Sequence, residues 1–422
     1  NLTHKLSANL LTAYGDTSGA VKYTYEYERL RRIDYPDNFQ NQVFYDYGAP
    51  GDEHGRAGRI WRQMDASGGQ EFFYGPLGEV VKNIRTIIIN QAQVHTYVWQ
   101  QRYDSWNRVQ EMAYPDGEIV DYEYNAAGKL RAMTGEKGGQ QYPIIDRMGY
   151  DQFAQRVYMK QGNGAETRYR YETDRRRLDT LLVDIHPEGL APRTIMRNDY
   201  AYDQVNNILA LTNDAPLADG QLGGTMSAEY QYDSLYRLVD AQATYIGNVR
   251  SDSYALQMEY DNLHNIVQKA QQDTTNMLTK PRVNHDLAYV YADEQERPHV
   301  PSRIGTRTYG YDANGNLTSW AEDHPTYLSR DFHWDEENRL KAIRHNGEMN
   351  FYTYDAAGER AMKSHGGMQA VYMNGAPVGL INHDRNWTAY VSPYLVVTER
   401  GFTKHYYIEG QRVASRIGSG QF

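Results

Sequence analysis

Tyrosine alternates with polar residues in short segments along the chain, and each segment is followed by a turn-like sequence. Clear examples are "YEY" before Asn125, "YQY" before Asp233 and "YTY" before Asp355. A period of two residues is typical of a β-strand that buries one face and exposes the other. In the turn, an Asp or Asn side chain bonds to the backbone, and a Gly or Asn takes the left-handed conformation. The pattern therefore predicts β-hairpins with tight turns.

The hairpin pattern recurs as a degenerate repeat, with the aromatic residue before the turn as its marker. Neighbouring markers are as close as 20 residues, between Trp334 and Tyr354, and the interval lengthens to 30 residues between Tyr202 and Tyr232. Variants open and close the chain, at residues 23–37 and 406–414. The residues assigned to the structural repeat motif are Tyr103, Asp104, Tyr124, Gly128, Leu130, Tyr150, Asp151, Tyr171, Tyr202, Asp203, Tyr232, Asp233, Leu238, Tyr260, Asp261, Tyr311, Asp312, Gly315, Leu317, Trp334, Asp335, Leu340, Tyr354, Asp355 and Gly358.

The turn after Tyr124 predicts a definite register. A left-handed Gly128 would end a three-residue loop that pairs Asn125 with Lys129 and sets Tyr124 opposite Leu130. An aromatic side chain opposite an aliphatic one is a favourable cross-strand pair. The same offset of six residues predicts three further pairs: Tyr232 with Leu238, Tyr311 with Leu317, and Trp334 with Leu340.

The repeat predicts an all-β fold. An isolated hairpin is marginally stable in water, so tandem antiparallel hairpins must add edge to edge, as solenoid repeats do. Because sheets twist with a fixed hand, the long sheet should coil, and helices should be scarce. We expect one repeat domain over residues 1–422, with insertion-like loops near 176–199, 214–229 and 272–301, where the pattern fits least well.

Composition favours a thin structure. Hydrophobic residues make up 40% of the chain, and the 38 tyrosines outnumber the 9 phenylalanines and 6 tryptophans. Tyrosine buries its ring while its hydroxyl stays wet or hydrogen-bonded. A wall with water on both sides therefore fits better than a thick core. The strongest apolar run, "IRTIIIN" at 84–90, predicts one buried strand.

Several function classes find no support. The net charge of −10 argues against a nucleic-acid groove, and no apolar run is long enough to span a membrane. The absence of cysteine excludes disulfides and Cys-based zinc sites. The chain starts at Asn1 without a signal-peptide pattern, so we expect a fragment of a longer protein.

No catalytic, metal or cofactor site is predicted, and no cofactor is expected. The adjacent pairs His285–Asp286 and His383–Asp384 lack a metal-binding context. "GSG" at 418–420 is interpreted as a flexible terminal loop, and "GEKGGQQ" at 135–141 as a hairpin turn. The Asp residues of the repeat recur at one turn position, which indicates turn caps and not the paired carboxylates of a glycoside hydrolase.

Tyr-Asp followed by x-x-Gly and Arg/Asn-Leu resembles the YD repeat of the Rhs and YD-repeat proteins. The resemblance rests on "YGYDANGNL" at 309–317, "YQYDSLYRL" at 230–238, "YTYDAAGER" at 352–360 and "YYIEGQRVA" at 406–414. It implies a spiral of hairpins that closes into a hollow, cocoon-like shell around a C-terminal toxin or a delivered effector. Related shells occur in the toxin-complex proteins of insect pathogens and in the teneurin adhesion receptors.

One departure limits what the resemblance implies. Toxin members of the family carry a self-cleaving region with Asp-Pro-x-Gly motifs and then a variable toxic domain. No such motif occurs in this chain. Neither the self-cleaving aspartates nor a toxin can therefore be assigned to its residues.

Three functions follow from the sequence and the resemblance. The first is a structural container without catalysis, made in the bacterial cytoplasm and then secreted or injected. Its partners would be a toxic cargo and a component of a secretion or contractile-injection apparatus, with no nucleic acid and no membrane span. The second is an adhesion or carbohydrate-binding module that uses the Tyr-rich outer surface. The third, a glycoside hydrolase or lyase, ranks last because no carboxylate pair stands out.

Overall fold

The computed structural model describes residues 1–420 apart from 91–92, 187–188, 190, 218–222, 292–296, 323–327, 346–347, 367, 374–375 and 383–384. For residues 90, 368–373, 376–382 and 385 it describes the backbone alone. Strands account for 62% of the chain and helices for 3%, which confirms the all-β prediction. No helix in the described part of the chain has the length and apolar content that crossing a membrane requires.

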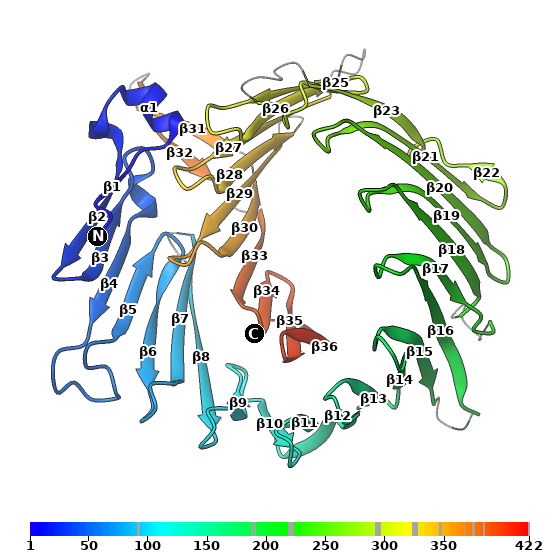
Figure 1. Ribbon diagram of the computed structural model, residues 1–422. Coiled ribbons are helices and arrows are strands. Elements are labelled where there is room, and N and C mark those ends of the chain that lie inside the picture. Colours follow the sequence, from blue (N-terminus) through cyan, green and yellow to red (C-terminus); the bar gives the residue numbers. More distant parts are fainter. Residues whose placement is uncertain are drawn as a thin grey trace. The chain divides into compact units, whose positions relative to one another are not determined.

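The chain forms two compact units. Unit 1 comprises Asn1–Val120 and Arg307–Phe422, and unit 2 comprises Asp121–Thr306. Both are built from antiparallel strands in which each hairpin pairs with the next one along the chain (Figure 1). That residues 1–422 form one repeat domain stays a prediction.

The first segment of unit 1 is a run of consecutive antiparallel strands from β1 to β9, with α1 and η1 between β1 and β2 and η2 between β3 and β4. Its elements are β1 (His4–Lys5), α1 (Ala8–Tyr14), η1 (Thr17–Gly19), β2 (Val21–Glu26), β3 (Arg29–Asp34), η2 (Phe39–Asn41), β4 (Val43–Tyr47), β5 (Ile60–Asp65), β6 (Gly68–Tyr74), β7 (Val80–Asn90), β8 (Gln93–Tyr103), β9 (Val109–Ala113) and β10 (Ile119–Tyr124), the last of which runs into unit 2.

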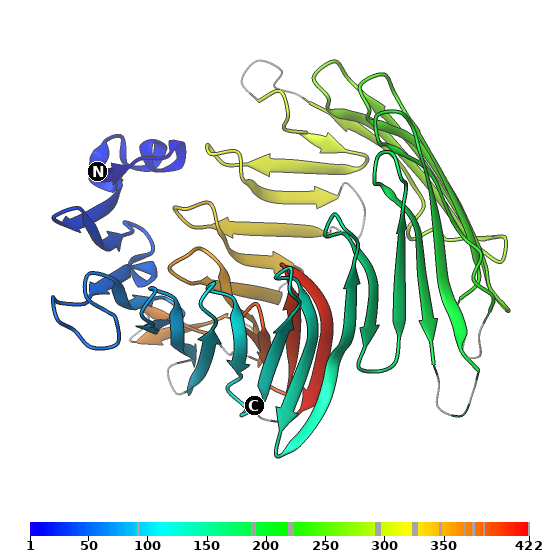
Figure 2. The ribbon, with the colours of Figure 1, turned by 60° about the horizontal axis from the view of Figure 1, so that its bottom comes forward.

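Unit 2 continues the same antiparallel order, and Figure 2 shows its hairpins side by side in a single layer. Its strands are β11 (Leu130–Lys137), β12 (Gln140–Tyr150), β13 (Arg156–Gln161), β14 (Glu166–Tyr171), β15 (Leu178–Ile185), β16 (Arg193–Tyr202), β17 (Ile208–Asn213), β18 (Thr225–Tyr232), β19 (Leu238–Ile246), β20 (Ser251–Tyr260), β21 (Ile266–Thr275), β22 (Leu278–Thr279), β23 (His285–Val290) and β24 (Arg303–Ile304).

The second segment of unit 1 is a further run of hairpins, in which β30 pairs with β33 while β31 and β32 pair with each other. Its strands are β25 (Arg307–Tyr311), β26 (Leu317–Glu322), β27 (Ser329–Trp334), β28 (Leu340–His345), β29 (Glu348–Tyr354), β30 (Arg360–Gly366), β31 (Met368–Met373), β32 (Ala376–Asn382), β33 (Arg385–Ser392), β34 (Leu395–Thr398), β35 (Gly401–Ile408) and β36 (Gln411–Ser419).

The structure differs from the expected insertion-like loops. Most of 176–199 lies in β15 and β16, which pair with each other across six positions. The segment 272–301 contains the end of β21 together with β22 and β23, and 225–229 belong to β18. Every residue of β15 is half-buried. A strand with both faces partly exposed to water does not need to alternate Tyr with polar residues. The period-two pattern therefore did not reveal β15.

Two smaller expectations also have an outcome. "GEKGGQQ" is a hairpin turn as expected, since Lys137 pairs with Gln140 across Gly138 and Gly139. "GSG" is not a terminal loop, because residues 418 and 419 lie in β36 and pair with β35. Backbone pairing with β35 holds residues 418 and 419 in the sheet, although the residues of this segment are small and polar.

Apolar packing is concentrated in unit 1. Leu10 of α1 packs with Val21, Ile33, Tyr35 and Val43 in a buried cluster. In the run at 84–90, which lies in β7 as expected, residues 87 and 89 are buried while 88 is exposed. The run therefore buries one face of its strand and leaves the other toward solvent.

Candidate functional site

Each YD turn is closed by the side chain of its Asp. After Tyr232, Asp233 Oδ1 accepts hydrogen bonds from the backbone N–H of Leu235 at 2.8 Å and of Arg237 at 3.0 Å. Its Oδ2 accepts from Arg237 Nε at 2.7 Å. The backbone N–H of Arg237 lowers the pKa of Asp233, so this cap stays ionised. Equivalent pairs of backbone bonds are accepted by Asp104, Asn125, Asp151, Asp203, Asp261, Asp335 and Asp355.

The residue three positions after the cap is left-handed. Gly128, Gly315 and Gly358 have φ values of 77°, 87° and 83° there. The same position is filled by Tyr236 with φ 62° and by His264 with φ 67°. Only glycine adopts this conformation without a steric cost. The turn is therefore fixed by its cap more strictly than by its glycine.

The register predicted from the sequence is present beside the turns. Tyr232 is opposite Leu238, Tyr311 is opposite Leu317, and Trp334 is opposite Leu340. In the turn after Tyr124, Asn125 N–H donates to the carbonyl of Lys129 at 2.8 Å.

Further from each turn the pairing slips by one residue, as between Gln231 and Tyr232. This β-bulge recurs in the hairpins that end at Tyr260, Trp334 and Tyr354. The sequence did not reveal it, because a bulge leaves the marker and the turn in place and shifts only the partners beyond them.

The marker aromatic residue ties each hairpin to the preceding one. Tyr232 Oη donates to the carbonyl of Ile208 at 2.9 Å, and Ile208 is the first residue after the preceding turn. Tyr260 repeats the bond to Leu238 at 2.9 Å, and Trp334 makes it through Nε1 to Leu317 at 2.7 Å. The same bond links further pairs: Tyr47–Leu30, Tyr74–Ile60, Tyr103–Val80, Tyr171–Arg156, Tyr202–Leu178, Tyr291–Ile266 and Tyr354–Leu340.

We call this set of bonds the tyrosine interlock. Sequence reasoning predicted an amphipathic role for tyrosine but missed its partner. The available signal was the nearly constant interval of 22 to 25 residues between donor and acceptor from Tyr202 to Tyr291, although the bond from Tyr171 to Arg156 spans only 15. Burial raises the pKa of the donors, among them Tyr202, Tyr232 and Tyr260. The remaining markers Tyr124, Tyr150 and Tyr311 end β10, β12 and β25.

In unit 1 the YD turns of the second segment contact the first segment. Asn9 of α1 donates through its N–H to Asn314 Oδ1 at 2.9 Å and through Nδ2 to Asp312 Oδ2 at 2.8 Å. Asn314 N–H donates back to Asn9 Oδ1 at 3.1 Å. One turn therefore holds the N-terminal helix through three hydrogen bonds.

The next two turns make similar contacts. Glu336 accepts from the N–H of Asp37 at 2.9 Å, the N–H of Asn38 at 2.8 Å and Asn38 Nδ2 at 2.8 Å. Ala356 N–H donates to Asp65 Oδ2 at 2.8 Å. We refer to these contacts together as the seam of unit 1.

Buried charges line the seam. Arg85 donates to Ser67 Oγ at 2.7 Å, and its guanidinium lies 3.9 Å from a carboxylate oxygen of Asp65 and of Asp355. Burial raises the pKa of Asp355. In a low-dielectric site such charges are tolerated only as partners of one another.

A second buried cluster joins β35 to the turn before β10. Lys404 Nζ, 1% exposed, donates to Asp116 Oδ2 at 2.8 Å and to Glu118, which is fully buried. Tyr406 Oη donates to the same Glu118 carboxylate at 2.9 Å. Neither this cluster nor the one at Arg85 has a sequence signal, because their members lie far apart in the chain.

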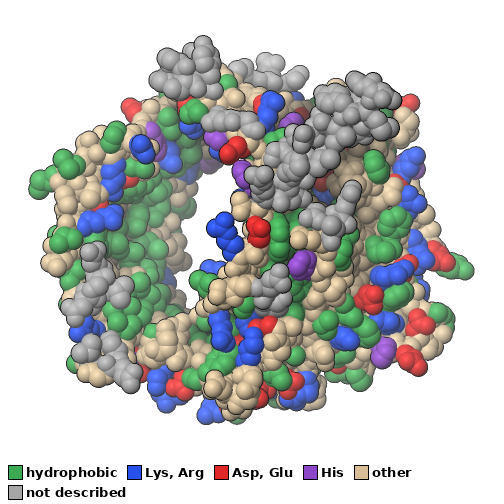
Figure 3. Space-filling model, turned by 180° about the vertical axis from the view of Figure 1, so that it is seen from behind, with side chains coloured by type: hydrophobic (Ala, Val, Ile, Leu, Met, Phe, Trp, Pro, Cys, Tyr) green, Lys and Arg blue, Asp and Glu red, His purple; other side chains and the backbone are tan. Residues whose placement is uncertain are grey.

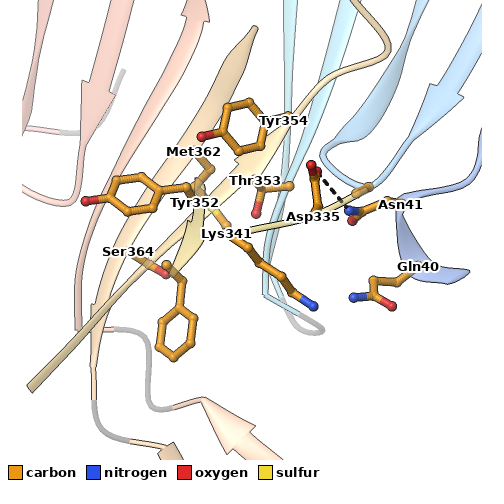
Figure 4. A pocket seen from close by; sticks show the side chains of 11 residues that line it. Gln40, Asn41, Asp335, Lys341, Tyr352, Thr353, Tyr354, Met362 and Ser364 are labelled. Carbon is orange, nitrogen blue, oxygen red and sulfur yellow. Dashed lines mark hydrogen bonds between the residues drawn. The ribbon is translucent and has the colours of Figure 1, made fainter. Parts of the chain in front are cut away.

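Two of the pockets along unit 1 are lined by polar and charged side chains. Figure 4 shows the first, of about 230 Å³, where Asn41 of η2 donates to Asp335 Oδ2 at 3.5 Å and the side chain of Lys341 extends from β28 toward Gln40. The second, of about 870 Å³, is lined by residues that include Arg360, Tyr390 and His405. Burial lowers the pKa of His405, which favours its neutral form.

No group of three or more His, Cys, Asp or Glu residues able to hold a metal ion occurs in the described part of the chain. His285 begins β23, and Asp286 accepts from Gln268. The pair His383–Asp384 lies outside the described residues. Basic, acidic and hydrophobic side chains are interspersed over the face seen in Figure 3.

Comparison with known proteins bears on the repeat. A model of the family described as RHS Repeat matches residues 103–141. The chain is 31% identical to toxin subunit YenC1 of Yersinia entomophaga over 144 residues, which are 33% of this chain and 15% of that protein. It is 37% identical to toxin subunit YenC2 of the same organism over 123 residues, 28% of this chain and 13% of that protein. The chain therefore contains an RHS repeat and resembles the Rhs/YD-repeat proteins.

The chain also has a solved structural neighbour. The crystal structure titled TcdB2-TccC3-Cdc42 superposes with a TM-score of 0.72 at 18% identity, and covers 96% of this chain and 21% of that one. Identity this low shows the fold alone. Together these findings confirm the resemblance expected from the YD motifs, and they identify a toxin-related RHS-repeat protein.

Proposed function

We propose that this chain is a wall segment of a container that encloses a toxic polypeptide and performs no catalysis itself. The part of the unit 2 sheet that follows Gln161 carries the proposal. The larger buried hydrophobic side chains of unit 2 lie between Leu130 and Met159, whereas those described between 162 and 306 are four alanines, at 165, 215, 228 and 241, and one leucine, at 256. A sheet with so little core has water on both sides, as a wall requires.

The tyrosine interlock supports the same function. A single layer cannot gain stability from a second layer packed on it, so its hairpins must be joined along their edges. Each interlock bond satisfies a hydroxyl and a carbonyl while its ring covers the neighbouring hairpin. Such a wall is held together without large apolar patches that would grip an unfolded cargo.

Three further parts of the proposal follow from the relatives. They are toxin subunits, so the cargo would be toxic and the partners would be other toxin components. A component of a secretion or contractile-injection apparatus is a further partner that we propose from the family resemblance alone. The assembled protein would act outside the cell that makes it. The absence of catalysis is supported by the turn aspartates, whose oxygens are occupied as caps.

The test uses the fact that this chain contains no cysteine. A single cysteine is placed in an unfolded reporter at the end of the native polypeptide, and the protein is purified from its own host with its copurifying subunits. Enclosure predicts slow reaction with a bulky maleimide in the native state and fast reaction in urea. Equal rates in both states would show that the reporter is outside and would overturn the proposal.

The alternative function, adhesion or carbohydrate binding, is favoured by exposed aromatic side chains at turns. Tyr27 is 95% exposed and Trp106 is 69% exposed. A glycan array that gives one saturable ligand, lost in Trp106→Ala, would support it.

A further inference from the structure

Four turns of unit 2 expose a large apolar side chain at the same position, two residues after the cap. These side chains are Phe153, Val205, Leu235 and Leu263, with exposed fractions of 49%, 48%, 56% and 50%. Isolated exposed apolar residues are common on protein surfaces. Here they recur at one position in four of five consecutive turns, with Asp174 at that position in the remaining turn, and we call these four residues the tip row. In unit 1 the same position after the cap Asp104 also exposes an apolar side chain, Trp106.

Polar bonds fix the tips beside one another. Arg177 Nη1 donates to the carbonyl of Asp203 at 2.8 Å, and Arg237 Nη1 donates to that of Asp261 at 3.2 Å. Gln155 Nε2 donates to the carbonyl of Arg176 at 3.1 Å. Adjacent tips are two strands apart, and at about 4.8 Å per strand they repeat about every 10 Å.

Unit 1 shows what such a tip can bind. There the corresponding position is Asn314, and it receives the helix α1 through Asn9. The docked turn after Trp334 carries a charged residue, Glu337, at this position, and the one after Tyr354 carries Ala357. Polar and small tips therefore meet a polar partner, whereas the tip row presents apolar side chains.

We propose that the tip row binds an amphipathic α-helix of a partner polypeptide with an apolar residue at every seventh position. Seven helical residues rise about 10.5 Å, which matches the spacing of the tips. A strand does not match, because its same-face side chains repeat about every 6.6 Å.

One turn in this region predicts the charge of one position in the partner helix. Between the turns of Phe153 and Val205 lies the turn 172–177, which holds three arginines and two carboxylates and so has a net positive charge. Glu172 is paired with Arg177, the exposed Arg175 donates to the carbonyl of Gln204, and the exposed Arg176 lies over the ring of Phe153. The heptad position that meets this turn should therefore be acidic. The complete partner helix has apolar residues at heptads one, three, four and five, and Glu at heptad two.

The probe is a fluorescent peptide of that pattern, about 32 residues long, titrated against the full chain by anisotropy. We expect saturable binding that weakens about tenfold or more in Leu235→Asp/Leu263→Asp, because two apolar contacts become charged. Ile417→Asp and Val249→Asp, at exposed apolar positions outside the row, should leave binding unchanged.

Two further measurements test the charge predicted at heptad two. A peptide with Lys at heptad two should bind more weakly to the native chain, and Arg175→Glu/Arg176→Glu should reverse that order. Absence of saturable binding, binding unaffected by the tip substitutions, or equal binding of a proline-interrupted peptide would each overturn the proposal. Urea midpoints equal to the native one establish that the variants fold. The experiment does not depend on enclosure of a cargo.

Discussion

The YD turns between β25 and β30 in unit 1 and those between β16 and β21 in unit 2 close in the same way but meet different surroundings. In both, the cap accepts from the backbone and the marker bonds to the preceding hairpin. In unit 1 the tips are docked against another segment, and in unit 2 they project into solvent. The motif therefore encodes the hairpin, while the two residues after the cap determine what the hairpin touches.

The largest effect should come from alkaline pH, because it acts on the interlock of both units. Burial raises the pKa of interlock donors such as Tyr202, Tyr232 and Tyr260. It also raises the pKa of Tyr23 and Tyr97, which are outside the interlock, to about 12. A tyrosine with a raised pKa in the fold contributes stability that is complete below its unfolded pKa of about 10. That stability is lost as pH rises from 10 toward 12.

We therefore expect the urea midpoint to fall steeply above pH 10 in both units. Absorbance of tyrosinate, followed in the same samples, checks that ionisation accompanies unfolding. A midpoint constant up to pH 12 would contradict the interlock.

The buried charges of unit 1 should be far more sensitive to substitution than exposed ones in unit 2. Lys404→Met removes the buried cation shared by Glu118 and Asp116 and leaves Glu118 with the half-exposed Arg416 at 3.8 Å, which should cost about 4 kcal/mol of the free energy of unfolding. The control is Lys160→Met, which removes an exposed ion pair with Asp146. Urea unfolding should show no resolvable change for the control, and similar losses in both variants would refute the contrast.

The docked turn after Trp334 is tested by changing Glu336, the residue that follows its cap Asp335. Glu336→Ala removes the acceptor for two backbone N–H groups and for Asn38 Nδ2, all at the seam, and should cost about 3 kcal/mol. The equivalent residue of a free turn is Ser234, and Ser234→Ala should change the free energy of unfolding little. Chemical denaturation of both variants measures the difference, which vanishes if the seam contributes nothing.

A single interlock bond should matter less. Tyr232→Phe deletes the hydroxyl that donates to Ile208, which should cost about 1 kcal/mol. Tyr230→Phe, on the same strand, removes a hydroxyl for which no hydrogen bond is described and serves as the matched control. Equal urea midpoints for the two variants would mean that the hydroxyl does not join the hairpins.

The sequence predicted those features that depend on a few neighbouring residues. The pairing of Tyr232 with Leu238 follows from one turn, and so could be worked out from nine letters. The bulge beyond it could not, because no residue type is specific to it. The contact of Glu336 with Asn38 spans 298 residues and depends on the path of the whole unit. β15 was mistaken for a loop because a strand wet on both faces lacks alternation.

The smallest effect concerns backbone strain at a free tip. Tyr236 holds φ 62° where Gly315 holds 87° in a docked turn. Tyr236→Gly should therefore raise the free energy of unfolding by about 0.5 kcal/mol, since relief of the left-handed strain exceeds the entropy that glycine adds to the unfolded chain. Gly315→Ala should lower it by about 1 kcal/mol, because the same strain is introduced. Opposite signs in urea unfolding would show that the cap holds both turns in one conformation whatever residue fills the position, whereas destabilisation by Tyr236→Gly would mean that the tyrosine ring makes a contact that the free turn needs.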